Sequence, residues 1–282
     1  MKFLGEVLSL SVQYLKEKEV TSPRLVAESL LSHILDVKRM DLYLRFECPL
    51  EERELSLFRL ALKKAALGEP VEYILSSVVF YGLKLFVSPS VLIPRQETEI
   101  LVDLAAMVLG KEELQGKVLF DVCSGSGCIG LSLKKKFPQL SVFLSDISQE
   151  ALSVSQRSAE THDLDVLLMQ GDLMAPFEGV KADFVFCNPP YISDLEYEEL
   201  SFSVKGYEPK LALVGGITGL EFYQRLAADL PNYVNHGARV FFEIGYQQAE
   251  DVSKIFSTAC WVRKEVKKDW SGKDRFFFLE IE

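Results

Sequence analysis

The sequence has no long apolar run and little glycine or proline. Crossing a bilayer takes about 20 consecutive apolar residues, yet even the apolar segment Leu101–Leu109 contains Asp103. Near the N-terminus, Glu6, Ser9 and Gln13 interrupt any core of a signal peptide. With 17 glycines and 11 prolines among 282 residues, collagen-like and low-complexity chains are excluded. We therefore expect a globular cytoplasmic protein without membrane contact.

Basic residues and histidines are also scarce. The 31 lysines and arginines are outnumbered by 41 aspartates and glutamates, for a net charge of −10. This balance disfavours a protein that holds nucleic acid by neutralising phosphates, so we expect no direct nucleic-acid binding. The five cysteines are odd in number and scattered, which favours a reduced chain. Cys123 and Cys128 have the wrong spacing for a zinc knuckle, and the three histidines lack partners at ligand spacing, so no metal is predicted.

Residues 1–70 are predicted to form a small helical bundle. Its first apolar stripe repeats at spacings of three and four residues. A second helix is expected to begin at Ser22-Pro23, with Ser22 as its cap, and a third to end at Gly68. The bundle holds no catalytic cluster; we interpret it as structural, with recognition of a substrate protein as the alternative. The first stripe consists of Leu4, Val7, Leu8, Val12 and Leu15.

The pattern changes after residue 70. Residues 71–95 are predicted to form a hairpin connector, because β-like runs flank Gly82 and Pro89 and Pro94 follow. In residues 96–282, apolar strands alternate with amphipathic helices, which predicts a doubly wound α/β domain. Continuous apolar runs such as Phe184–Phe186 indicate a sheet covered on both faces. The predicted strands, one of the last two antiparallel, are Lys117–Val122, Ser141–Asp146, Val166–Gln170, Asp183–Cys187, Ala238–Ile244, Trp261–Val266 and Arg275–Ile281.

The first strand of this domain leads into a glycine-rich turn and a helix at Ile129–Lys136. The turn has glycines at 125, 127 and 130, in the spacing and the strand–turn–helix context of a dinucleotide-binding loop. Glycine lets a ligand approach the backbone and tolerates positive φ. Asp146 ends the next strand about 20 residues later, where an acidic side chain accepts hydrogen bonds from ribose hydroxyls. The loop alone leaves NAD, FAD and S-adenosylmethionine as alternatives.

The strand Asp183–Cys187 is followed by Asn188-Pro189-Pro190-Tyr191, at the strand end where ligands of open α/β sheets bind. The two prolines supply no backbone N–H. The loop is therefore rich in acceptors, namely its carbonyl oxygens and the Asn188 amide oxygen. Such a pocket suits an NH₂ group, because both hydrogens need partners once water is excluded.

This loop predicts methyl transfer to a planar nitrogen, whose delocalised lone pair makes it a weak nucleophile. We expect the Asn188 side-chain oxygen and the Pro189 carbonyl to bind both N–H hydrogens and turn the lone pair toward a methyl group. These bonds raise the rate if they strengthen as the nitrogen becomes tetrahedral. Tyr191 is expected to stack on a planar substrate, and its face also suits a sulfonium cation.

The chain resembles a known family at these residues. Asn188–Tyr191 is similar to the motif of class I S-adenosylmethionine-dependent methyltransferases that act on planar nitrogens, including those of DNA and RNA. The segment Ile93–Glu99 narrows the resemblance to the release-factor glutamine methyltransferase family, the HemK-type proteins. Nearly the whole chain is covered. The other matching motifs are Gly68-Glu69-Pro70, Phe80-Tyr81-Gly82, the glycine loop, Glu208-Pro209, Leu211-Ala212-Leu213, Gly215-Gly216, Glu243-Ile244-Gly245 and Gly272-Lys273-Asp274-Arg275.

The resemblance implies a helical domain (1–70), a hairpin (71–95) and a seven-stranded, Rossmann-like methyltransferase domain (96–282). The implied reaction methylates the side-chain nitrogen of the glutamine in the Gly-Gly-Gln motif of peptide chain release factors, and converts S-adenosylmethionine to S-adenosylhomocysteine. We expect a monomer. The implied cofactor residues are Cys123, Ser124, Gly125, Ser126 and Gly127 at the methionine part, Asp146 at the ribose, Asp172 and Leu173 at the adenine, and Asn188. The implied substrate residues are Asn188, Pro189, Pro190 and Tyr191 at the glutamine amide, with Arg95 and Glu97 supporting the loop.

Two residues depart from the family pattern. Cys123 stands where the loop usually has its first glycine, and we expect weaker or altered cofactor contact there. Gln96 replaces a proline, which loosens the backbone beside Arg95 and Glu97. The alternative interpretation of Arg95, Glu97 and Glu99 is that they simply form the first turn of a helix, where acidic side chains are ordinary.

Two other functions remain as alternatives. An amino-methyltransferase acting on a DNA or RNA base would use the same acceptor loop and flip the base. Against it stand the acidic balance and the sequence Leu-Glu-Tyr-Glu-Glu at 195–199, where a nucleic-acid enzyme would place basic and aromatic residues. A cofactor-binding interaction module would instead tolerate replacement of Asn188.

Overall fold

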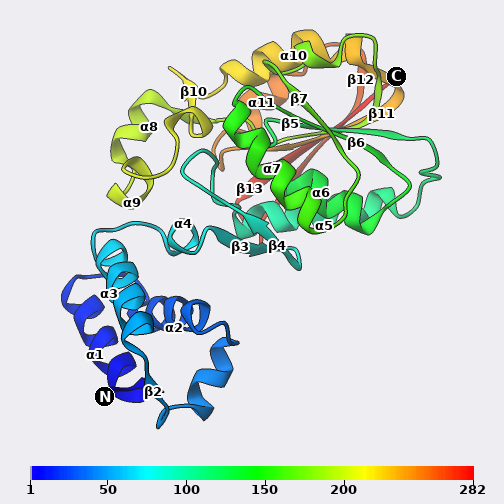
Figure 1. Cartoon of the computed structure of the whole chain (residues 1–282). Helices are drawn as coiled ribbons and strands as arrows, with labels where there is room; N and C mark the ends of the chain where they lie inside the picture. The colour runs from blue at the N-terminus through cyan, green and yellow to red at the C-terminus, as the bar shows by residue number, and fades with distance from the viewer. Residues whose placement is uncertain (1) are drawn as a thin grey trace. The chain divides into compact units, whose positions relative to one another are not determined.

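The computed structural model describes residues 2–282 and divides them into two compact units, each with its own buried core (Figure 1). The smaller, mostly helical unit runs to Ser77 and includes Ser201–Tyr207 from much later in the chain. The larger α/β unit holds Val78–Leu200 and Glu208–Glu282.

The helical unit folds around the apolar stripes that the sequence predicts, with Leu4, Leu15 and Phe58 at most 1% exposed. The predicted cap at Ser22 is wrong. Ser22 adopts the left-handed conformation (φ 52°), so its side chain makes no capping hydrogen bond, although Pro23 does begin the helix. The elements of the unit are β1 (Lys2–Phe3), α1 (Leu4–Glu17), α2 (Pro23–Ile34), a 3-10 helix (Arg39–Leu44), β2 (Pro49–Leu50), α3 (Glu52–Ala66), α4 (Val71–Leu75) and α9 (Phe202–Lys205).

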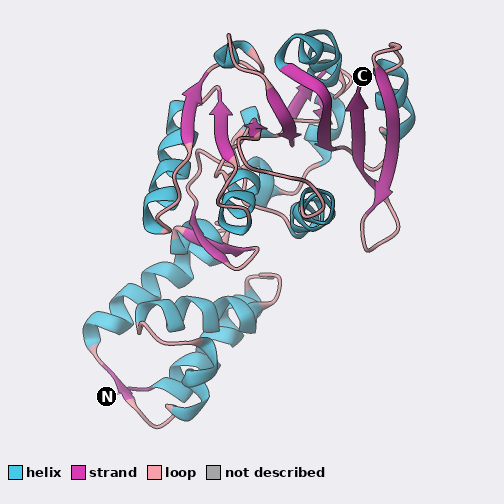
Figure 2. Ribbon diagram, turned by 90° about the vertical axis from the view of Figure 1, so that its right-hand side faces the viewer, coloured by secondary structure: helices cyan, strands magenta, loops and turns pink. Residues whose placement is uncertain are grey.

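The α/β unit is built on a seven-stranded sheet in the order β12-β13-β11-β8-β5-β6-β7. Figure 2 draws its strands in magenta. Neighbouring strands are parallel except at β13, which is antiparallel to both β11 and β12. The doubly wound α/β domain and its antiparallel strand near the end of the chain are thus confirmed. The strands are β5 (Val118–Val122), β6 (Ser141–Asp146), β7 (Leu167–Gln170), β8 (Ala182–Cys187), β11 (Val234–Glu243), β12 (Trp261–Lys268) and β13 (Asp274–Ile281).

Helices cover both faces of this sheet. Consecutive residues Leu119 and Phe120 are both fully buried, but they belong to different cores on opposite faces. This confirms that the continuous apolar strands belong to a sheet with no solvent-exposed face. One core takes residues from α5 (Gln96–Leu109), α6 (Cys128–Lys136) and α7 (Gln149–Thr161), and the other from α10 (Glu221–Tyr233) and α11 (Ala249–Ile255).

The carboxyl ends of the parallel strands meet at one edge, and several short elements surround that edge. The hairpin of β3 (Ser77–Phe80) and β4 (Leu83–Phe86) buries Phe80 and Leu85 in the core of the α/β unit. The short β9 (Ile192–Ser193) pairs in parallel with β10 (Val214–Gly216) and so fixes the chain directly after Tyr191. The remaining elements are α8 (Asp194–Glu199) and two 3-10 helices (Ala175–Phe177 and Lys210–Ala212).

Candidate functional site

A cavity of about 400 Å³ lies where β5, β6, β7 and β8 end. This volume is within the range of sites for small ligands and cofactors. The predicted site residues on its wall are Arg95, Cys123, Ser124, Gly125, Ser126, Asp146, Asp172, Leu173, Asn188 and Pro190. The predicted residues that do not line it are Glu97, Gly127, Pro189 and Tyr191.

The glycine-rich turn follows β5 in a left-handed path. Cys123, Gly125 and Gly127 have φ values of 57°, 54° and 75°, a conformation that costs glycine little and other residues more. Cys123 thus follows the turn without being glycine. Gly130 shows why the following helix needs a glycine: a Cβ there would lie 2.2 Å from Leu144 Cδ2. The turn therefore places the backbone of Gly125, which no side chain covers, on the wall of the cavity.

Asp146, at the end of β6, joins the turn to the wall of the cavity. Its Oδ2 accepts a hydrogen bond from the Gly125 N–H (2.9 Å), and its Oδ1 accepts one from the Ser148 N–H (2.9 Å). Burial raises the pKa of Asp146, opposed by these N–H donors. A carboxylate oxygen accepts more than one hydrogen bond, so both oxygens retain capacity for the hydroxyl groups of a ligand.

Two polar side-chain atoms at or just before the turn lack partners. Within residues 2–282, the Ser124 Oγ and the Asp121 Oδ1 are buried and make no hydrogen bond. Asp121 Oδ2 accepts the Gly130 N–H (2.8 Å), while burial, with the charge of Asp146 adding to it, raises the pKa of Asp121 to about 8. Buried polar atoms without partners are rare in folded proteins. Ser124 also lines the cavity, although its Oγ is itself covered.

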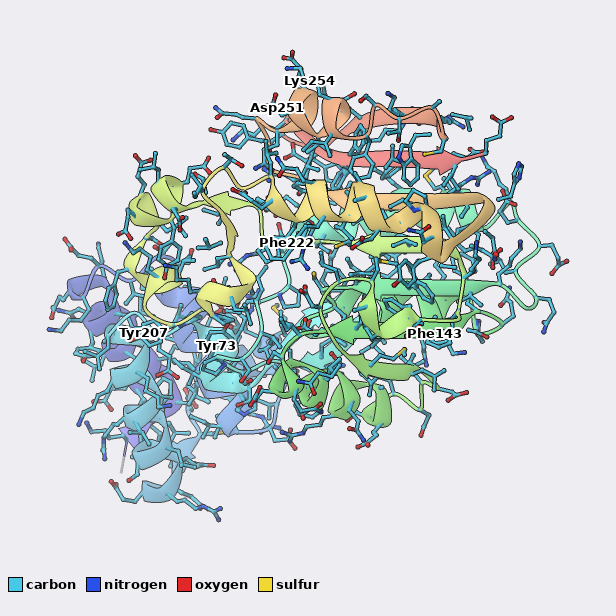
Figure 3. The ribbon with its side chains drawn as sticks, turned by 90° about the horizontal axis from the view of Figure 1, so that it is seen from above. Tyr73, Phe143, Tyr207, Phe222, Asp251 and Lys254 are labelled. Carbon is cyan, nitrogen blue, oxygen red and sulfur yellow. The ribbon has the colours of Figure 1, made fainter. Side chains whose placement is uncertain are left out.

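Apolar side chains also line the cavity. Leu173 is 4% exposed and lines the cavity together with Ile147 and with Phe222 of α10, which Figure 3 labels. Asp172 is held by Arg225, whose Nη2 lies 2.6 Å from Asp172 Oδ2. A polar turn together with apolar side chains fits a ligand that combines an amino acid or sugar with a flat ring.

The Asn188–Tyr191 loop closes the cavity at the end of β8. No hydrogen bond joins the Asn188 side-chain amide to any of residues 2–282, and the side chain lies on the cavity wall. Pro189 and Pro190 are buried. Neighbouring backbone packs so closely on this loop that a Cβ on Gly215 would lie 2.4 Å from the Pro190 carbonyl oxygen. The loop thus presents a free amide from a tightly packed backbone.

Tyr191 lies behind the cavity wall. Its hydroxyl donates to Glu243 Oε1 (3.4 Å), and Thr98 Oγ1 donates to Glu243 Oε2 (2.7 Å). Glu243 is 2% exposed, and burial raises its pKa. Burial likewise raises the pKa of Tyr191. The stacking contact expected from the sequence would need the Tyr191 ring in the cavity, and Tyr191 is not among the residues that line it.

Arg95 lies at the cavity, whereas Glu97 does not. Arg95 lines the cavity, and its Nη2 lies 2.6 Å from Oε1 of the buried Glu208, whose Oε2 accepts the Ile93 N–H at 3.3 Å. Glu97 is exposed in the first turn of α5. Glu99, in the same turn, accepts the Tyr81 N–H at 2.6 Å. Arg95 is therefore brought to the site, and Glu97 is not.

Sequence reasoning gave no role to four residues that build this site, although each of them lies in a segment that the sequence analysis quotes. Asp121 and Glu243 are single acidic residues near the ends of apolar strands, and that signal could have identified them. Thr98 and Glu208 gave no comparable signal, because their partners lie 145 and 115 residues away.

Residues 2–282 contain no group of three or more histidine, cysteine or acidic residues that could hold a metal ion. They also contain no helix that is long and apolar enough to span a membrane.

The fold and this site define a class I S-adenosylmethionine-dependent methyltransferase. Residues 6–75 match the family described as PrmC N-terminal domain, and residues 98–202 match the methyltransferase small domain. The chain belongs to the release factor glutamine methyltransferase family. It is 41% identical to a release factor glutamine methyltransferase from Chlamydia trachomatis over 98% of this chain and 94% of the relative. The corresponding protein of Geobacter sulfurreducens is 38% identical over 96% of this chain and 94% of that relative.

Solved structures agree on the fold. A 16S rRNA methyltransferase from T. thermophilus, solved in complex with AdoMet and guanosine, superposes with a TM-score of 0.53 at 15% identity. The match covers 73% of this chain and 50% of that chain. The seven-stranded class I fold predicted from the sequence is thus confirmed.

Proposed function

We propose that this protein transfers a methyl group from S-adenosylmethionine to the side-chain nitrogen of the glutamine in the Gly-Gly-Gln motif of peptide chain release factors. The observation that carries this proposal is the unpaired Asn188 amide on the cavity wall, beside a proline-rich backbone with no N–H to offer. The names of the relatives support the release factor as the substrate.

The residues of the cavity fit the cofactor. Asp146 would accept hydrogen bonds from the ribose hydroxyls, since a carboxylate has about four acceptor positions and the backbone N–H donors do not use all of them. The partnerless Ser124 hydroxyl and the open backbone at Gly125 would hold the methionine part. Leu173 and Ile147 would cover the adenine. When bound, the cofactor supplies an electrophilic methyl group on a sulfonium.

The acceptor loop would act on the substrate nitrogen. The Asn188 Oδ1 and the Pro189 carbonyl would accept the two N–H bonds of the glutamine amide and hold its lone pair toward the cavity. As the nitrogen becomes tetrahedral, its hydrogens become more acidic and both hydrogen bonds strengthen, which lowers the barrier selectively. Because the two prolines have no N–H, no donor of these residues competes for the lone pair.

The wall around the loop would keep this arrangement in place. Arg95 is fixed by the buried carboxylate of Glu208, and Tyr191 by that of Glu243. Polar groups that are already held in place do not have to reorient during the reaction, whereas water molecules would. We propose both as supports of the substrate loop.

The helical unit would recognise the intact release factor. Leu57, Leu60 and Leu67 recur on one side of α3 and its end, and they are 48%, 57% and 71% exposed. Exposed apolar side chains at this spacing suit a protein partner. We propose that this surface binds the release factor in the cytoplasm.

The test uses purified protein with radiolabelled S-adenosylmethionine and either release factors or DNA and RNA from the same cell. We expect label in the release factor, on the glutamine of Gly-Gly-Gln when the peptide is analysed by mass spectrometry. Label in nucleic acid and none in the release factor would overturn the proposal in favour of a base-directed amino-methyltransferase.

A further inference from the structure

The Asn188–Tyr191 loop has few means of holding its own position. Pro189 and Pro190 cannot donate backbone hydrogen bonds, and the first firm backbone bond after the prolines is from the Ile192 N–H to the Leu213 carbonyl (3.0 Å). The orientation of the loop must therefore depend on donors from elsewhere that bind its carbonyl oxygens.

One side chain supplies such a donor. The Gln248 Nε2 donates to the Tyr191 carbonyl at 2.9 Å and to the Gly219 carbonyl at 3.3 Å. The Gln248 Oε1 accepts the Gly245 N–H at 2.9 Å. One amide thus connects the acceptor loop to the segment before α10 and to the turn after β11.

The orientation of this amide is determined by its partners. Two carbonyl oxygens need the NH₂ group and one N–H needs the oxygen, so only one of the two amide orientations satisfies all three. The backbone of Gln248 is also fixed, because its N–H donates to the Gly245 carbonyl (2.9 Å) and its carbonyl accepts the Val252 N–H (2.9 Å). The side chain therefore starts from an anchored position at the N-cap of α11.

Glycines give the three backbone segments room to reach this amide. A Cβ on Gly219 (φ 76°) would lie 2.3 Å from the Tyr191 carbonyl oxygen and 2.9 Å from the Gln248 Nε2. A Cβ on Gly245 would lie 2.8 Å from the Gln248 Oε1. Such close packing leaves little freedom for the Tyr191 carbonyl to move independently of Gln248.

We propose that Gln248 is a positioning residue for the methyl transfer, acting on Tyr191 and through it on the direction of the Asn188 and Pro189 acceptors. Gln248 does not line the cavity, so it acts without touching cofactor or substrate. This role rests on the proposed function. A neutral amide suits the position because it donates and accepts at once and does not change charge with pH.

The variants Gln248→Glu and Gln248→Met keep the length of the side chain and remove its NH₂ donor. Gln247→Glu and Gln247→Met are the matched controls, because Gln247 is the adjacent residue and is exposed. Displacing a reacting group by about 1 Å can cost roughly 100-fold in rate. We expect kcat on the release factor to fall about 10- to 100-fold in both Gln248 variants, with cofactor affinity by calorimetry changed less than about threefold.

A second measurement does not depend on activity. Hydrogen exchange of the peptide that spans residues 188–193 is compared among wild type, the Gln248 variants and the Gln247 variants, after circular dichroism has shown that each is folded. We expect faster exchange at Tyr191 and Ile192 in the Gln248 variants alone. Unchanged exchange, or equal loss of activity in the Gln247 variants, would overturn the proposal. Wild type that fails to methylate release factors would refute the proposed function, while exchange would still decide the role of Gln248.

Discussion

The surroundings of the buried Asp121 predict how the stability of the folded protein changes with pH. Its carboxyl is 1% exposed, one oxygen has no partner among residues 2–282, and its pKa is raised from 3.8 to about 8. A carboxyl whose pKa is higher in the folded state favours folding only at low pH. That contribution is present in full below pH 3.8 and is lost as the pH rises toward 8.

The variant Asp121→Asn removes this dependence and keeps an oxygen to accept the Gly130 N–H. One pKa unit corresponds to about 1.4 kcal/mol. Between pH 5 and pH 8 the free energy of unfolding of the wild type should therefore fall by about 4 kcal/mol relative to that of the variant. The variant should be the more stable of the two at pH 8, with a much smaller difference at pH 5.

Chemical denaturation without cofactor, at both pH values, measures these differences. Asp165→Asn is the control, since Asp165 is exposed. A difference for Asp121→Asn that is the same at pH 5 and pH 8 would refute the view that burial raises the pKa of Asp121 in β5.

Two further predictions concern the cofactor and the partner protein. Asp146→Ala should weaken cofactor binding at least about tenfold, because hydrogen bonds to a charged group contribute about 1.5–3 kcal/mol each; unchanged affinity in calorimetry would remove the proposed role of Asp146. Leu60→Glu, on the exposed face of α3, should raise the KM for the intact release factor several-fold and leave the KM for a short Gly-Gly-Gln peptide unchanged. Equal effects on protein and peptide would contradict recognition by the helical unit.

The sequence predicted the sheet well because burial on both faces leaves a continuous apolar signal. Six of the seven predicted strands agree with the structure to within two residues at each end. The strand predicted at Ala238–Ile244 begins earlier, at Val234, because the chain passes a bulge with Gly237 at positive φ before it resumes pairing. The short β9 and β10 gave no such signal, since Val214–Gly216 contains two glycines and forms a strand only through its partner.

The site was predicted where it depends on local sequence. Gly125, Asp146 and Asn188 follow strands, and strand ends in a parallel sheet converge. The contacts of Arg95 with Glu208 and of Tyr191 with Glu243 join residues 113 and 52 positions apart, and no local pattern indicates them. For the same reason the sequence did not show that the Tyr191 hydroxyl is bound to a buried carboxylate.

The most direct test compares wild type with Asn188→Ala on the intact release factor. Cofactor binding is measured by calorimetry, and methylation of the Gly-Gly-Gln glutamine by mass spectrometry over time. One neutral hydrogen bond contributes about 0.5–1.5 kcal/mol, so the variant should bind the cofactor within about tenfold of wild type. Its turnover should fall at least about 100-fold. Turnover near the wild-type rate would contradict the claim that this amide oxygen orients the nitrogen that receives the methyl group.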